Sequence, residues 1–304
     1  MFSIVPSFMQ SALVASLLIG VSCGYLSVYV ILKRLVFLAI ALAQFASAAV
    51  AISLFFSMDS TMATLAAFIG VLIGALFFSW PGLGRFLPRE NAIGTGYALA
   101  SAVGIILIAN NAQGETHLLN LLYGDVLTVT HAELWVMSGV MLVAGFIYLR
   151  YAREFLFTSF DAEMAKTVGI RTRLWEVLFY VTLGSVIAMA IRLGGMMLVF
   201  ALLVLPGYAA LLARCRIRQA FAWAVIMAVV AGVAGLLLSF YGDKIPGIHS
   251  DNFHWDTLPA SAITIAVLGA MVIISVIVNV VKGRHSVTRR SQRGRAFHPP
   301  LTGA

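Results

Sequence analysis

Residues 8–34 read FMQSALVASLLIGVSCGYLSVYVILKR, a run of about 25 apolar residues that ends at the basic pair Lys33-Arg34. A helix rises 1.5 Å per residue, and about 20 apolar residues cross the hydrocarbon layer of a bilayer. A cleaved signal peptide has a basic start and a shorter apolar core, and this run has neither. The run therefore predicts a retained membrane span.

Similar apolar runs recur along the rest of the chain. Hydrophobic residues make up 61% of the 304 residues and charged residues only 11%, whereas soluble domains are roughly one quarter charged. We therefore expect an all-α polytopic membrane protein, with a membrane domain over residues 1–283 and a basic, disordered tail over 284–304. About nine spans are predicted, at 8–32, 35–57, 60–79, 92–110, 132–151, 176–191, 195–213, 219–241 and 258–281.

Basic residues gather on one side of these predicted spans. If nine spans alternate, all of the twenty Lys and Arg residues except Arg192 and Lys244 fall on that side. By the positive-inside rule that side is the cytoplasm, so we expect the N-terminus outside and the C-terminus inside. The net charge of +8 then indicates contact with anionic membrane lipid and no nucleic-acid partner, the alternative being an RNA contact by the tail at 289–295.

Signatures of catalysis and of cofactor binding are absent from the sequence. It contains no phosphate-binding loop, no HExxH, no paired zinc cysteines and no GxSxG, and Cys23 and Cys215 fall at different depths of the predicted topology. The interiors of the predicted spans hold essentially no ionisable residues, which argues against proton coupling. We therefore expect a non-enzymatic chain without a cofactor, energised by another subunit if it uses energy.

The longest predicted cytoplasmic connection, at about 152–175, contains a short amphipathic helix. Asp161 is suited to cap its start, and Gly169 is suited to end it. The segment is either a surface helix that joins two spans or a docking helix for another subunit. The pattern Glu163-x-Ala165-x-x-x-Gly169 resembles the EAAxxxG loop of ATP-binding-cassette importers, which implies a coupling helix seated in a cleft of the ATPase subunit.

Four segments in order resemble the permease subunits of the bacterial ABC-type zinc/manganese/iron-chelate importers. They are 33–38 (KRLVFL), 121–129 (LLYGDVLTV), 161–169 (DAEMAKTVG) and 195–206 (GMMLVFALLVLP). The resemblance covers roughly residues 20–240 and implies a permease of the bacterial inner membrane that imports zinc, manganese or iron by alternating access. It also implies three partners: an ABC ATPase subunit that hydrolyses ATP, an extracytoplasmic solute-binding protein, and a second permease in a homodimer or heterodimer.

One departure from the family's pattern concerns the cargo. The family's second span usually carries an Asp and, four residues later, a His that face the translocation pathway, and the matching positions here are Ile40 and Gln44. An amide binds first-row metal ions poorly, so a metal chelate or another small solute is an alternative cargo, and a non-transporting scaffold is an alternative function.

The neighbourhood of Gln44 allows two interpretations. Gln44 and Ser47 lie near one stripe of a helix that is rich in small residues between 41 and 51. Such a surface favours tight helix packing with an interhelical amide hydrogen bond. It is equally consistent with a pore-lining amide that leaves room for cargo, so we place Gln44 and Ser47 on the predicted translocation pathway.

The helix expected at 195–213 contains Pro206, which lacks a backbone N–H and clashes with the preceding turn. We expect a broken helix near Pro206, either as an ordinary kink or as part of the pathway together with Gly195.

The exterior loop at 249–256 concentrates His249, Asp251 and His254. Imidazole and carboxylate groups suit zinc, iron or manganese, so these residues are a candidate metal-capture site, the alternative being a merely solvated loop.

Overall fold

The computed structural model describes residues 7–56, 60–80, 88–109, 124, 131–160, 162–213, 216–241 and 259–295. Every regular element in these ranges is a helix, so the prediction of an all-α protein is confirmed. The helices are α1 (Ser7–Leu32), α2 (Leu38–Phe55), α3 (Ser60–Ser79), α5 (Arg89–Ile108), α7 (His131–Arg150), α8 (Ala152–Phe160), α9 (Ala162–Thr167), α10 (Thr172–Leu212), α11 (Ile217–Tyr241) and α12 (Ala260–Arg295).

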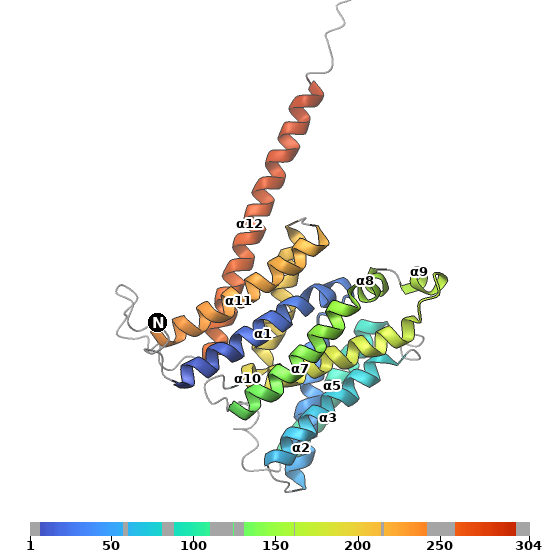
Figure 1. The fold of residues 1–304 in the computed structure, drawn as a ribbon, viewed down its shortest axis with the longest axis vertical. Helices are drawn as coiled ribbons and strands as arrows, with labels where there is room; N and C mark the ends of the chain where they lie inside the picture. The colour runs from blue at the N-terminus through green and yellow to red at the C-terminus, as the bar shows by residue number, and fades with distance from the viewer. Residues whose placement is uncertain are drawn as a thin grey trace, which may run out of the picture.

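Five of the described helices are long and apolar enough to cross a membrane, namely α1, α2, α10, α11 and α12. The pair α7 and α8, bent by 72°, raises the number to six if it forms one span. The 41-residue α10 covers two of the predicted spans, and α12 extends as helix to Arg295, into the predicted basic tail (Figure 1). The count of nine crossings and the domain boundary after residue 283 stay predictions.

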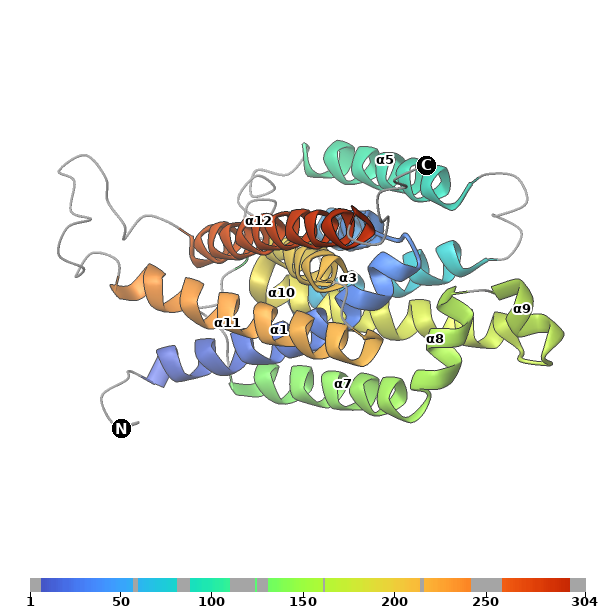
Figure 2. The same ribbon diagram turned by 90° about the horizontal axis from the view of Figure 1, so that it is seen from above.

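Helix α10 joins two groups of helices (Figures 1 and 2). In one group α1 and α12 both pack on α11 and on α10, while α7 and α8 pack on α1 and α10. In the other group α3 and α5 pack on α2, and α10 contacts this group through α2 and α3. Helices α8 and α9 lie at the end of the bundle opposite the N-terminus.

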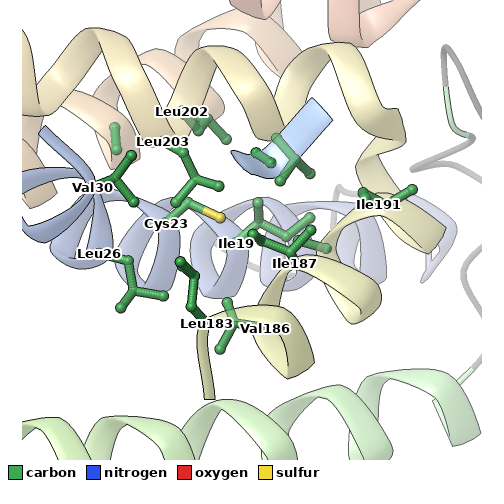
Figure 3. Packing of buried hydrophobic residues seen from close by; sticks show 14 of the residues in the cluster. Ile19, Cys23, Leu26, Val30, Leu183, Val186, Ile187, Ile191, Leu202 and Leu203 are labelled. Carbon is green, nitrogen blue, oxygen red and sulfur yellow. The ribbon is translucent and has the colours of Figure 1, made fainter. Parts of the chain in front are cut away.

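The core forms where α10 bends around α1. Figure 3 shows the two arms of α10 on opposite sides of α1, with Leu183 and Ile187 on the first arm and Leu203 on the second. These side chains and Ile19 and Cys23 of α1 are all buried. Since lipid tails are as apolar as leucine, dispersion contacts from close packing stabilise this core.

Glycines permit the closest helix contacts. Gly20 and Gly24 form a GxxxG motif on α1, and a Cβ added at Gly24 would lie 2.8 Å from the Ala228 Cβ and 3.0 Å from the Ala224 carbonyl oxygen of α11. A second such motif on α3 includes Gly70, where a Cβ would lie 2.6 Å from the Phe45 carbonyl oxygen of α2. Small residues at this spacing let helix backbones approach each other within a membrane. The sequence analysis missed both motifs.

The break in α10 lies at Gly195, so the prediction of a broken helix near Pro206 was wrong in position. Gly195 has φ 76° and ψ 158°, and the remaining residues of α10, including Pro206, keep helical geometry. Proline is tolerated in membrane helices because neighbouring groups satisfy the freed backbone. Gly207 beside it lets α1 approach closely, since a Cβ there would lie 2.6 Å from the Ser27 carbonyl oxygen.

We expect Gly24→Val to separate α1 from α11, because the added side chain would meet the α11 backbone. Overpacking of this kind costs about 1–3 kcal/mol in the free energy of unfolding. Thermal or denaturant unfolding of the purified protein in detergent measures this loss. The matched control is Gly139→Val on α7, where a Cβ meets nothing within 4 Å. Equal stability of the two variants would contradict the proposed role of Gly24.

Candidate functional site

The α2 residues at the family's usual ligand positions lie one turn apart on a partly open face. Ile40 and Gln44 are both half-buried, and Phe37 and Phe55 near the same stripe are 64% and 59% exposed. Among the described residues, none hydrogen-bonds the Gln44 side chain. The amide is therefore partly exposed on α2, and no described interhelical hydrogen bond holds it.

Ser47 lies in a different environment from Gln44. Its side chain is buried, and a Cβ added at Gly104 of α5 would lie 3.6 Å from its hydroxyl oxygen. Helix α5 therefore covers Ser47. Of the two α2 residues predicted on the pathway, Gln44 is partly exposed in this conformation and Ser47 is buried.

Three glycines meet at the bend of α10. Gly124 has a φ of 64°, and a Cβ added there would overlap the Gly195 nitrogen and the Gly194 carbonyl carbon and lie 2.8 Å from the Gly195 Cα. Two backbones touch directly at this point, which only glycine permits. The sequence analysis quoted Gly124 within a motif but missed this junction. Pro206 lies roughly 16 Å further along the second arm, at 1.5 Å per residue, so it is remote from the junction.

Helix α9 contains the residues predicted to dock an ATPase. Glu163 is exposed on it, whereas Ala165 is fully buried. Gly169 has a φ of 86°, and its N–H donates to the Lys166 carbonyl at 3.1 Å while the Ile170 N–H donates to the Ala165 carbonyl at 3.0 Å. These two bonds form a Schellman motif, so the prediction that Gly169 ends the helix is confirmed. Asp161 lies outside the described residues.

Charged residues from three helices gather at the same end of the bundle. Arg89 at the start of α5 forms an ion pair with Glu176 of α10. The Lys33 ammonium, just beyond α1, lies 4.6 Å from the centroid of the Phe179 ring, a cation–π contact. Burial lowers the pKa of Lys33 to about 8, an effect that Glu176 opposes and Arg89 reinforces. The sequence analysis missed this cluster because no local motif links residues so far apart along the chain.

The residues predicted to capture a metal, His249, Asp251 and His254, lie outside the described residues. Within the part of the chain that the structure describes, no group of three or more His, Cys, Asp or Glu residues could hold a metal ion.

The lowered pKa of Lys33 predicts a pH dependence of stability. The folded protein binds this proton less tightly than the unfolded chain, whose lysine has its ordinary pKa of 10.5. Burying the charged lysine therefore lowers the free energy of unfolding by its full amount below about pH 8. This destabilisation disappears as the pH rises from about 8 to 10.5. We expect the free energy of unfolding to rise with pH in this window, and Lys33→Met to flatten that rise.

Denaturant unfolding in detergent between pH 7.5 and 10.5 measures this slope. Lys166→Met, which removes an exposed lysine of α9, is the control and should leave the slope unchanged. A slope that is the same in wild type and Lys33→Met would contradict the prediction.

Comparisons with known proteins extend these observations. The model of the ABC 3 transport family matches residues 6–249. The manganese transport system membrane protein MntC of Halalkalibacterium halodurans is 29% identical over 241 residues, which cover 79% of this chain and 82% of that protein. The "Probable iron transport system membrane protein" of Haemophilus influenzae is 25% identical over 240 residues, covering 79% and 84%.

A solved structure has the same fold. The chain aligns with a structure of PsaBC from Streptococcus pneumoniae in complex with Fab, with a TM-score of 0.72 at 22% sequence identity. The alignment covers 89% of this chain and 91% of that chain.

Proposed function

This chain belongs to the ABC 3 transport family, and from that premise we propose that it is the membrane-spanning permease of an ATP-driven importer for a divalent transition metal ion. The observation that carries the proposal is the family match over residues 6–249. Manganese and iron are the favoured cargoes, because two relatives aligned over most of their length are named as manganese and iron transport proteins, and zinc is a further candidate.

The proposed complex contains three further components. ATP would be hydrolysed on a separate ABC ATPase subunit, an extracytoplasmic solute-binding protein would deliver the cargo, and a second permease would complete the membrane domain. The proposed location is the bacterial inner membrane, with the N-terminus outside and the C-terminus in the cytoplasm. The distribution of basic residues supports this orientation.

The proposed mechanism is alternating access driven through α9 and α10. Helix α9 would dock on the ATPase through its exposed face, which carries Glu163, with Asp161 at the start of the segment and Gly169 at its end. Helix α10 begins a few residues later, and its first arm extends roughly 34 Å to the break at Gly195. Since α10 contacts both groups of helices, displacing its first arm would move one group against the other.

We place the translocation pathway beside Gln44 and the Gly195 junction. The partial exposure of Gln44, with no described hydrogen-bond partner for its amide, supports this assignment. Ser47 and Pro206, also predicted on the pathway, are buried in this conformation and would line it only after the helices move. His249, Asp251 and His254 are proposed to capture the metal ion at the exterior mouth.

A metal chelate is the second candidate cargo. Ile40 and Gln44 supply no carboxylate or imidazole at the family's usual ligand positions, and an amide binds bare first-row ions poorly. A chelated metal, whose coordination positions the chelator already fills, needs no such ligands from the protein. Because Ile40 and Gln44 supply no metal ligands, a non-transporting scaffold is a further alternative, and the uptake experiments below test for it.

We expect Gly169→Val to uncouple the permease from its ATPase. A β-branched residue in the left-handed conformation costs about 1–2 kcal/mol, so the turn after α9 would rearrange. Co-purification of the ATPase and transport-coupled ATP hydrolysis should both fall while the permease remains in the membrane. Gly139→Val is the matched control. Normal co-purification together with normal coupled hydrolysis in Gly169→Val would refute the docking role of α9.

Substitutions of Gln44 test the function and the cargo together. In cells lacking the gene, we expect the wild type to restore accumulation of manganese or iron, and Gln44→Leu to abolish this at normal protein levels, because leucine has a similar volume but no amide. Gln44→His should shift preference toward zinc or manganese, since it restores an imidazole. Uptake of the first-row metals, with and without chelators, is the measurement.

Each outcome of this experiment has a distinct meaning. Uptake by the wild type only when a chelator is supplied would identify a chelate importer, and no uptake by the wild type of any metal would indicate a scaffold. Unchanged rates and preferences in both Gln44 variants would place this residue in helix packing, at a cost of about 0.6 kcal/mol for a typical membrane hydrogen bond.

A further inference from the structure

A groove of about 880 Å³ lies between α9 and the first turns of α10. The groove is wide and open along its length, unlike an enclosed cavity. The lining residues are Lys166, Gly169, Ile170, Arg171, Thr172, Arg173, Leu174, Val177, Leu178 and Val181.

The floor of the groove is an apolar stripe that runs along α10. Leu174, Val177, Leu178 and Val181 recur at the three- and four-residue spacing that places side chains on one helix face. Leu174 is 54% exposed and the other three are partly exposed, whereas Phe179 on the opposite face is fully buried. From Leu174 to Val181 the stripe rises roughly 10 Å, and Val177, Leu178 and Val181 fall within the span predicted at 176–191.

The rim of the groove is cationic. Lys166, Arg171 and Arg173 are all exposed and lie at the end where α10 begins. The N-terminus of α10 adds the partial positive charge of a helix start. In the orientation predicted from the basic residues, this rim would lie near the inner lipid headgroups, just before the span predicted at 176–191.

We propose that this groove binds an anionic phospholipid of the cytoplasmic leaflet. Its phosphate would lie on Lys166, Arg171 and Arg173, and an acyl chain would follow the stripe to Val181. Basic pockets beside membrane helices on the cytoplasmic side suit anionic headgroups. A cytoplasmic ATPase could cover the rim, whereas Val177, Leu178 and Val181 of the floor belong to the span predicted at 176–191, where lipid is the expected neighbour.

The first experiment measures lipid binding to the full-length chain by native mass spectrometry, with phosphatidylglycerol and phosphatidylcholine as probes. We expect the wild type to prefer phosphatidylglycerol, and the double variant Arg171→Gln, Arg173→Gln to bind it about thirty-fold less tightly, since each basic residue near the headgroups contributes about a kcal/mol. The matched control is Arg216→Gln, Arg218→Gln, which removes two exposed cations at the start of α11. An equal loss in both double variants, or equal binding of the two lipids, would overturn the proposal.

A second experiment tests the apolar floor. We expect Val177→Trp to fill the groove and to weaken phosphatidylglycerol binding about ten-fold with all cations in place, while Val143→Trp on the exposed face of α7 has no effect. A photo-crosslinker at Val177 in membranes should capture phospholipid. Capture of a second permease copy or of the ATPase instead would show that a protein occupies the groove and would overturn the proposal. Lipid binding is measured without transport, so the proposed function can fail while this inference stands.

Discussion

Within the hydrocarbon layer of a bilayer, the backbone groups freed by a break in a helix must be enclosed by protein or must line a water-filled cavity. In this chain the break falls at Gly195, and the backbone of Gly124 lies directly against it. Both positions favour glycine, because a Cβ added at Gly124 would overlap the peptide between Gly194 and Gly195, and because Gly195 itself has a φ of 76°. The two arms of α10 diverge around α1 from this contact, and the core shown in Figure 3 lies between them and α1.

The first arm of α10 is held at both ends by contacts to distant parts of the chain. At the break it meets Gly124, and near its start Glu176 pairs with Arg89 of α5, while the Phe179 ring contacts Lys33. The ion pair is partly exposed and, by itself, contributes little to stability. The position of this ion pair matters for the proposed movement, because the pair links α10 to the group of α2, α3 and α5 at the end of the bundle where α9 lies. A displacement that begins at α9 must therefore either carry α5 along or break this pair.

Sequence reasoning succeeded where the constraint is local or is set by the bilayer. The apolar runs predicted α1, α3, α7 and α11 to within a few residues, because the membrane fixes the length of a span. Gly169 was predicted correctly because a Schellman motif involves only neighbouring residues. The break was misplaced because the prediction relied on the local effect of proline, whereas the break lies at Gly195, where Gly124 from a distant part of the sequence packs against it. The Arg89–Glu176 pair and the α1–α11 contact at Gly24 are equally non-local.

The proposed cargo path raises the question of how a permease could work without strong ligands at mid-membrane. A site that passes an ion must bind it well enough to admit it and weakly enough to release it. If a separate binding protein supplies affinity and an ATPase supplies energy, the membrane site needs little affinity of its own. Gln44, a neutral and partly exposed amide on α2, would then orient cargo without trapping it. Replacing a carboxylate and an imidazole by Ile40 and Gln44 would move selectivity from the membrane to the exterior partner, so exchanging that partner should change the cargo more than any substitution on α2.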